Sequence, residues 1–206
     1  MVLVVMADGA AEVAPTLPAE KVPVLEKIVS RYEEMANRVG DRFGIPRGWL
    51  IAMIERESGG NPLAFRLEKN GWTGIGLLQI TSPGVKAGLS DQALRDPETN
   101  LTCGARYISG LATRYGRDFP RVAAAFNAGS VLESDQNPWG MVQTTGHVSE
   151  EVAALNTYLL MDQRRAADRA LAYQFTTHDL LGEDFDRVTL PDIEVIEEAP
   201  ETVKNT

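Results

Sequence analysis

Hydrophobic residues recur at intervals of three and four along most of the chain, which is the period of α-helices that bury one face. Between these stretches, glycine and proline mark points where helices begin or end. The pattern predicts helices over residues 24–40, 46–58, 97–115, 120–126 and 150–175. Ser149 is expected to cap the last of these helices. The predicted fold class is therefore mainly α.

The segment between the second and third predicted helices, residues 61–96, breaks this pattern. It is rich in Gly, Pro, Ser, Thr and Asn, and it has no strong helical or strand period except in the short apolar piece Ile75–Ile80. We expect a long, shaped loop region here. The chain contains no internal repeat, so array architectures are excluded.

With 206 residues, the chain is long enough for one domain with extensions. Residues 1–20 contain Pro15 and Pro18 without periodicity and are expected to form a flexible N-terminal segment. Residues 21–178 form the predicted domain, and residues 179–206 form an acidic C-terminal extension with nine acidic and two basic residues. Because this extension is also rich in apolar residues, we expect it to dock onto the body, another subunit or a virion partner.

Charge and composition exclude several classes of function. A net charge of -9 without a run of basic residues argues against nucleic-acid binding. No stretch reaches the roughly 18 to 20 apolar residues of a membrane span. Cys103 is the only cysteine, which excludes an intramolecular disulfide. The apolar run Val2–Val5 lacks the basic start and the length of a signal peptide, so we do not expect one.

A carboxyl group lies on the apolar face of the second predicted helix. Glu57 follows Met53 by four residues, so the two side chains share a face, whereas Glu55 is expected to project sideways or outward. Burial of a carboxyl group favours its protonated form, which is the form that a catalytic acid needs. The residues alone leave two interpretations equally open: Glu57 is a catalytic acid, or it pairs with a core arginine such as Arg56 or Arg106.

Four sequence blocks together resemble a known family, the soluble lytic transglycosylases. The segment Ile54–Pro62 (IERESGGNP) resembles their catalytic ES motif, and Gly76–Ile80 (GLLQI) resembles their GLMQI motif. Residues 96–107 are similar to their DP..N...G.RYL helix, and Ala125–Gly129 (AFNAG) is similar to their AYNAG motif. Four blocks in order at family-like spacing argue against coincidence. The resemblance spans about residues 30–160 and extends to the goose-type lysozymes, which share the fold.

This resemblance implies a lysozyme-like α-helical domain with a glycan-binding cleft that acts on the bacterial cell wall, in the periplasm or outside the cell. In the family a single Glu, here Glu57, donates a proton to the glycosidic oxygen between N-acetylmuramic acid and N-acetylglucosamine. The same group then acts as a base while the muramoyl 6-hydroxyl attacks C1, so a 1,6-anhydro sugar forms without water. The implied partners are peptidoglycan glycan strands, and no metal or other cofactor is implied.

Roles for residues around Glu57 also follow from the resemblance. Ser58 is either a local hydrogen-bond partner or simply a helix-end residue. Gln79 and Asn127 correspond to residues that line the sugar cleft, where amides bond to N-acetyl groups. Tyr107 corresponds to a cleft tyrosine, with a ring packed on the core as the rival interpretation.

Two residues depart from the family pattern. Phe126 stands where the family usually has Tyr, so a hydroxyl near the acid is missing. His147 stands where many members have Tyr in a YV..V pattern. Two interpretations of His147 are open: it replaces the contact to Glu57 and titrates near neutrality, which would give a pH response, or it is a surface histidine in a loop.

Other functions stay open at this point. A goose-type hydrolase directs water to C1 with the help of a further acid, and Glu68 is the acid between Glu57 and Gln79 that qualifies. A second alternative is a wall-binding structural component that keeps the cleft but has lost catalytic activity. The absence of an expected signal peptide, together with the acidic extension, also favours a bacteriophage wall-degrading protein, carried in the virion or released at lysis.

Overall fold

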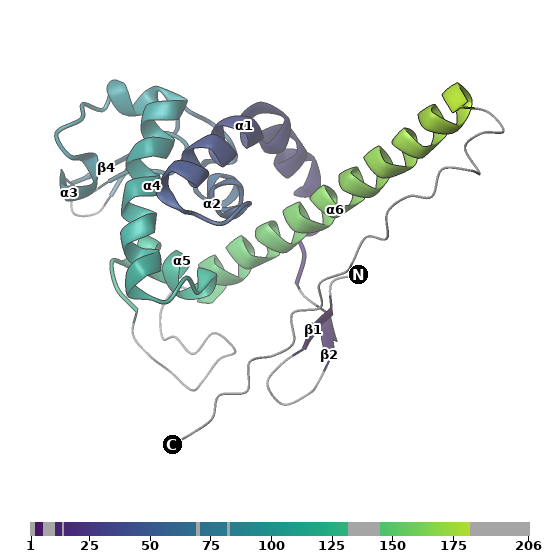
Figure 1. Ribbon diagram of the computed structural model, residues 1–206. Coiled ribbons are helices and arrows are strands. Elements are labelled where there is room, and N and C mark those ends of the chain that lie inside the picture. The colour runs from purple at the N-terminus through teal and green to yellow at the C-terminus, as the bar shows by residue number, and fades with distance from the viewer. Residues whose placement is uncertain are drawn as a thin grey trace, which may run out of the picture. The chain divides into compact units, whose positions relative to one another are not determined.

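The computed structural model describes residues 3–5, 11–13, 15–68, 71–81, 83–131 and 145–181 (Figure 1). The chain is mainly helical, as predicted, and it divides into two compact units, Met1–Gln163 and Arg164–Thr206. The predicted site residues all belong to the first unit. Residues of the predicted acidic extension beyond 181 lie outside the described part, so its docking role stays a prediction.

The N-terminal segment predicted to be flexible, residues 1–20, contains a β-hairpin and a buried residue that is bonded to the domain. β1 (Leu3–Val5) pairs with β2 (Ala11–Val13) in antiparallel orientation. Further along, Leu17 is buried and its amide donates to Thr157 Oγ1 at 2.8 Å. This bond fixes Leu17 to the last helix, α6 (Thr145–Leu181).

The first long helix is α1 (Val22–Phe43), whose apolar side is buried in the core. It passes through Gly40, where the sequence predicted its end, and ends at Gly44, which adopts a left-handed φ of 66°. A Cβ at Gly40 would lie 3.4 Å from the carbonyl oxygen of Ile45. Gly40 therefore permits the chain that leaves the helix to pack closely against it, whereas Gly44 provides the left-handed cap.

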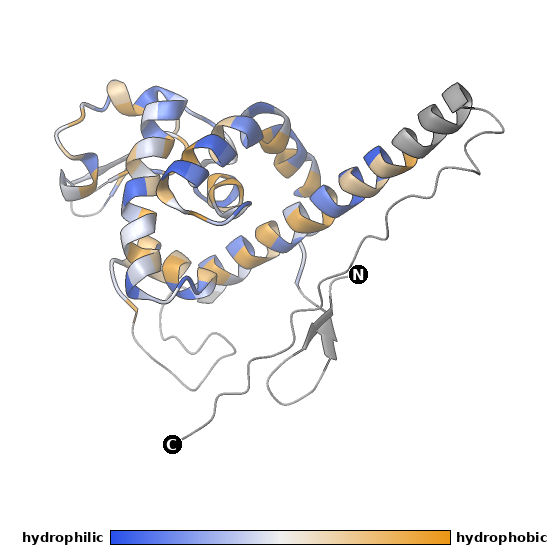
Figure 2. Cartoon of the chain, viewed as in Figure 1, coloured by the Kyte–Doolittle hydropathy of each residue, from blue (hydrophilic) through white to orange (hydrophobic). Residues whose placement is uncertain are grey.

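The helix that carries the predicted acid is α2 (Trp49–Ser58). Its first seven residues are all buried, and Figure 2 shows hydrophobic residues around most of its circumference, as expected for a helix inside a core. It begins later than the predicted start at Pro46, because Gly48 precedes it with a left-handed φ of 87°. A Cβ at Gly48 would lie 2.6 Å from Tyr158 Cδ1, so contact with α6 requires a glycine here.

Residues 61–96 form a shaped loop region around a small antiparallel hairpin. The hairpin joins β3 (Phe65–Leu67) to β4 (Thr73–Ile75), and the short helices α3 (Pro83–Lys86) and η1 (Ala93–Arg95) follow it. Strands of three residues are too short for alternation of polar and apolar positions to reveal them.

The next two helices begin where an aspartate caps them. Asp96 accepts from the amide of Thr99 at 2.9 Å and caps α4 (Pro97–Arg114), and Asp118 caps α5 (Phe119–Ala128). Hydrogen bonds from the side chain and the amide of Thr99 hold the pKa of Asp96 below its ordinary value. The predicted start of α4 is confirmed, and α5 extends the predicted range at both ends.

The last helix, α6, begins at Thr145, so Ser149 lies inside it and the predicted cap is wrong. Val148 in the first turn is fully buried, and packing of this turn stabilises helical structure before Ser149. Among the described helices, none is both long enough and apolar enough to cross a membrane.

A buried amide ties the loop region to α4. Asn100 is fully buried; its Nδ2 donates to Ile75 O at 2.8 Å and to Leu94 O at 2.9 Å, while its Oδ1 accepts from Leu78 N at 2.9 Å. Gly104, one turn further along α4, allows the loop to pack closely, since a Cβ there would lie 2.3 Å from Leu78 Cδ1. These contacts hold the GLLQI segment against the helix.

Asn100→Ala is expected to lower the free energy of unfolding by about 3 kcal/mol, because it leaves the buried Leu78 amide and Leu94 carbonyl without a partner and removes one of two bonds to Ile75 O. Asn156→Ala is the matched control, since Asn156 makes a single exposed hydrogen bond to Pro15 O and should cost less than about 1 kcal/mol. Urea unfolding followed by circular dichroism measures both values. Equal losses in the two variants would contradict the role given to Asn100.

Candidate active site

A cavity of about 360 Å³ lies among the loop region and helices α2, α4 and α5. It combines charged and amide side chains with three aromatic rings, a mixture suited to binding a sugar through stacking and hydrogen bonds. Its lining residues are Glu57, Arg66, Glu68, Trp72, Gln79, Ile80, Thr81, Val85, Tyr107, Phe126, Asn127, Ala128 and Gly129. The structure thus brings five of the seven predicted site residues to one cavity.

Glu57 reaches the cavity from the last turn of α2, just before the helix ends at Gly59. Its side chain is only 6% exposed, so the carboxyl group is largely withdrawn from bulk solvent. Ser58 does not line the cavity. Its hydroxyl donates to Ile54 O at 3.3 Å within the same helix, which fits the helix-end interpretation.

Gln79 is held at the cavity by a tight turn. It adopts a left-handed φ of 45°, which is strained for a residue with a side chain, and its Nε2 donates to Gly76 O at 2.9 Å. Gly76 itself has a φ of 76°, and a Cβ there would lie 2.3 Å from Asn100 Nδ2. The buried bonds of Asn100 thus fix the backbone that presents Gln79.

Helices α4 and α5 provide another part of the cavity lining. The rings of Tyr107 and Phe126 lie 5.9 Å apart between centroids, tilted by 44°, and Asn127 follows Phe126 in the last turn of α5. Tyr107 therefore both lines the cavity and packs against another ring, so the two interpretations of this residue coexist. Burial raises the pKa of the Tyr107 hydroxyl above its ordinary value.

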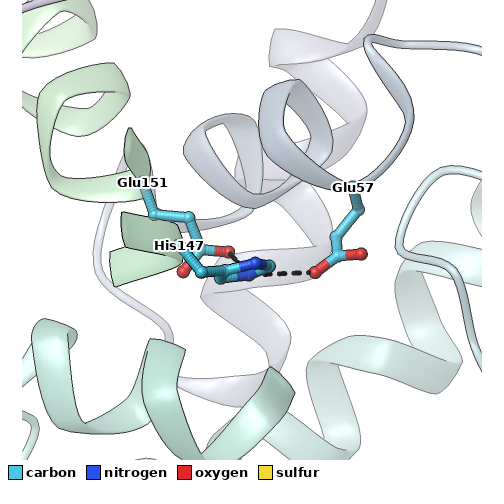
Figure 3. Close-up of side chains that lie close together, drawn as sticks. All are labelled: Glu57, His147 and Glu151. Carbon is cyan, nitrogen blue, oxygen red and sulfur yellow. Dashed lines mark ion pairs between the residues drawn. The ribbon is translucent and has the colours of Figure 1, made fainter. Parts of the chain in front are cut away.

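His147 lies beside Glu57 without lining the cavity itself (Figure 3). Its Nε2 is 3.3 Å from Glu57 Oε1 and 3.3 Å from Glu151 Oε1, so the imidazole lies between a carboxyl group of α2 and one of α6. The His147 side chain is 10% exposed, which contradicts the surface-loop interpretation. The structure places it where it contacts Glu57.

Two carboxyl groups control the charge of His147. Burial by itself opposes the charged imidazole, but the interactions with Glu151 and Glu57 outweigh it and raise the pKa of His147 to about 9. The expected titration near neutrality is therefore wrong, because both flanking carboxylates stabilise the imidazolium. Burial raises the pKa of Glu151 above its ordinary value, although His147 opposes that shift.

The arginines proposed as alternative partners of Glu57 point elsewhere. Arg56 Nε lies 3.4 Å from Glu150 Oε2, and Arg106 donates to the carbonyl oxygen of Val85 at 3.4 Å. Glu57 is thus paired with the titratable imidazole of His147 and with neither of these two arginines.

The expectation that Glu55 projects outward is wrong. Glu55 is 7% exposed, and burial raises the pKa of its carboxyl group. Helix α2 is covered by neighbouring elements on nearly all sides, so its polar positions are buried together with its apolar ones. Periodicity within one helix cannot reveal such cover.

Sequence reasoning missed Glu151, which lies directly against His147, and it missed Arg66 and Trp72 in the cavity lining. The spacing of four residues between His147 and Glu151 was the available signal, since positions i and i+4 meet on a helix. A helix that starts after Ser149 excludes His147, so the predicted start does not place His147 and Glu151 on one helix face.

The same three residues, Glu57, His147 and Glu151, are the described cluster that comes nearest to a metal site, with ligand atoms within 4.8 Å of one another. A charged imidazole lies between the two carboxyl groups and offsets part of their charge. The expectation of a reaction without a metal stays a prediction.

Comparisons with known proteins identify the family. The family model described as the transglycosylase SLT domain matches residues 34–138, about half of the chain. Protein IpgF from Shigella sonnei is 31% identical over 99 residues, which cover 46% of this chain and 64% of that protein. The membrane-bound lytic murein transglycosylase C from Edwardsiella ictaluri is 24% identical over 175 residues, which cover 75% of this chain and 46% of that protein.

Solved structures show the same fold. The 70 kDa soluble lytic transglycosylase from Escherichia coli matches 67% of this chain and 25% of its own, with a TM-score of 0.53 and 23% identity. The lytic transglycosylase Slt from Pseudomonas aeruginosa was solved as an inactive glutamate-to-glutamine mutant. Its match covers 66% of this chain and 24% of that chain, with a TM-score of 0.51 and 18% identity. This chain therefore spans only part of the length of these relatives.

The charge of His147 should make the stability of the protein depend on pH. Because the folded pKa of about 9 exceeds the ordinary value of 6.5, the stabilisation from the imidazolium is complete below about pH 6.5 and is lost as the pH rises through 9. The difference in free energy of unfolding between wild type and His147→Gln should therefore shrink from pH 6 to pH 9.5. Urea titrations at both pH values measure it, and a constant difference would contradict the pairing.

Proposed function

Because the chain belongs to the transglycosylase SLT domain family, we propose that it is a peptidoglycan lytic transglycosylase with Glu57 as its catalytic acid and then base. The bond cleaved is the β-1,4 bond between N-acetylmuramic acid and N-acetylglucosamine. The observation that carries this proposal is the position of Glu57, a largely buried carboxyl group in the lining of a polar cavity with aromatic rings.

The proposed reaction needs one carboxyl group in two protonation states. Glu57 gives its proton to the glycosidic oxygen, and the bond from that oxygen to C1 of the muramoyl ring breaks. The resulting carboxylate then takes the proton of the muramoyl 6-hydroxyl while this oxygen bonds to C1. Glu57 regains its proton, a 1,6-anhydro end forms, and no water is consumed.

Amide and aromatic groups of the cavity are suited to hold the glycan. The side chains of Gln79 and Asn127 offer donors and acceptors for N-acetyl groups, and Trp72, Tyr107 and Phe126 offer ring faces for sugar rings. Phe126 contributes no hydroxyl, so the partner that touches the acid is His147 instead, at 3.3 Å. In this chain a titratable group thus takes the place beside Glu57.

Hydrolysis in the manner of goose-type lysozymes is the second candidate, and one observation supports it. Glu68 lines the same cavity as Glu57, where a second carboxylate could direct a water molecule. However, Glu68 forms an ion pair with Arg66, with 2.6 Å between Glu68 Oε1 and Arg66 Nε, so one of its oxygens is already engaged. This pairing favours transglycosylation.

The proposed place of action is the bacterial cell wall, because peptidoglycan is the proposed substrate. The relatives named above come from bacteria, and they lend no support to the bacteriophage hypothesis. A wall-binding component without turnover is disfavoured, since the acid and the cavity beside it are both present.

Glu57→Gln should reduce the release of soluble fragments from purified peptidoglycan by about 10²-fold to 10⁴-fold, because the amide cannot donate the proton. Glu68→Gln is the matched control in the same cavity and should keep most of the activity. Turbidity loss of cell walls measures both. If wild type and Glu57→Gln clear walls equally poorly, the enzyme hypothesis fails.

The products distinguish the two mechanisms. Mass spectrometry of digested peptidoglycan should show 1,6-anhydromuramic acid ends, which are lighter by one water than reducing ends. A digest with only reducing ends, together with a large loss of activity in Glu68→Gln, would establish hydrolysis in place of transglycosylation.

A further inference from the structure

We propose that Glu151 is a positioning residue for Glu57, because it holds a proton on His147 directly beside the acid. The inference rests on the proposed role of Glu57. Glu151 is not among the residues that line the cavity, and its ion-pair contact is with His147, so it acts mainly through the imidazole.

Burial makes Glu151 dependent on His147. Its side chain is fully buried, and within the described part of the chain neither of its oxygens has a hydrogen-bond partner. A buried carboxylate without hydrogen bonds is costly to the fold. The main positive charge that offsets this cost is on His147, 3.3 Å away and one turn earlier on α6, and Arg56 adds a weaker contribution.

One nitrogen atom faces both carboxyl groups. His147 Nε2 lies 3.3 Å from an oxygen of Glu57 on α2 and 3.3 Å from an oxygen of Glu151 on α6 (Figure 3). A single proton on Nε2 therefore interacts with both carboxylates. Glu151 favours keeping that proton on the imidazole, and Glu57 is the group to which it can pass.

Other charges near His147 are neutralised by their own partners. Glu150, the adjacent residue on α6, lies 3.0 Å from Lys21 Nζ and 3.4 Å from Arg56 Nε of α2. The hydrogen bond from Lys21 is the main reason that the pKa of Glu150 is below its ordinary value. Glu57 and Glu151 thus remain as the carboxyl groups in direct contact with His147.

The proton balance of the proposed reaction closes within these residues. In the resting state His147 is charged and holds the proton beside Glu57. When the glycan is bound, transfer of the Nε2 proton to Glu57 makes Glu57 the acid, while the buried carboxyl group of Glu151 favours return of a proton to Nε2. After Glu57 has donated this proton and accepted the one from the 6-hydroxyl, the latter returns to Nε2.

A merely structural Glu151 would orient the imidazole without changing its ionisation, so the first test measures ionisation directly. The chain has two histidines, His147 and His178, which makes assignment of their imidazole signals simple. In the full chain, the nuclear magnetic resonance titration of His147 should have its midpoint near pH 9, and Glu151→Gln should lower it by at least about one unit. Glu150→Gln, which removes the same charge one residue away, should lower it by less than about 0.5 unit.

The second test is the pH profile of kcat/KM for release of soluble fragments from peptidoglycan, measured with a chelator present to exclude metal effects. The alkaline limb of the profile should move to lower pH in Glu151→Gln by about the shift found for His147, and should stay in place in Glu150→Gln. In a His147→Gln background, Glu151→Gln should produce no further shift.

Several outcomes would overturn the inference. One is a folded Glu151→Gln protein, shown by its thermal melt, with an unchanged His147 midpoint. Another is a shift of the alkaline limb by Glu151→Gln in the His147→Gln background that equals the shift in the wild-type background. If Glu151→Gln does not fold, a wild-type His147 midpoint within about 0.5 unit of 6.5 overturns it. Failure of the proposed function is distinguishable, since a shifted midpoint without cleavage of peptidoglycan would refute only the activity.

Discussion

The three buried hydrogen bonds of Asn100 are the constraint on which the geometry of the site depends. They fix two backbone carbonyls and one amide of the loop region against α4, at a place where water cannot substitute for them. Gly76 and Gly104 allow this close approach because neither carries a Cβ. The strained backbone of Gln79 persists in the turn that these bonds hold, so the wall of the cavity is set by a residue that does not line it.

A second constraint acts across the acid. In the first turn of α6, Val148 is fully buried and the adjacent His147 reaches Glu57 on α2. A permanent cation in this position would keep Glu57 ionised, and an apolar residue would leave its charge unbalanced. The imidazole of His147 differs from both, because it offsets the charge of a carboxylate and also carries a proton that it can give up. The proposed chemistry thus depends on where one proton resides.

Family membership and the special features of this chain concern different parts of the molecule. The family match covers residues 34–138, and with them the acid, the GLLQI turn and the aromatic pair of α4 and α5. His147 and Glu151 lie beyond that match, on α6. The proposed reaction therefore rests on residues within the family match. The proposed control of the Glu57 proton rests on the contacts of His147 and Glu151 in this chain.

Local signals in the amino-acid sequence were enough to predict the mainly helical fold, the start of α4 at Asp96 and Pro97, and the motifs that contain Glu57 and Gln79. The glycine that ends α1, the burial of Glu55 and the position of His147 between two carboxyl groups became evident from the folded chain. Periodicity and capping report interactions within a few residues, whereas burial and ionisation depend on elements that meet only when the chain has folded.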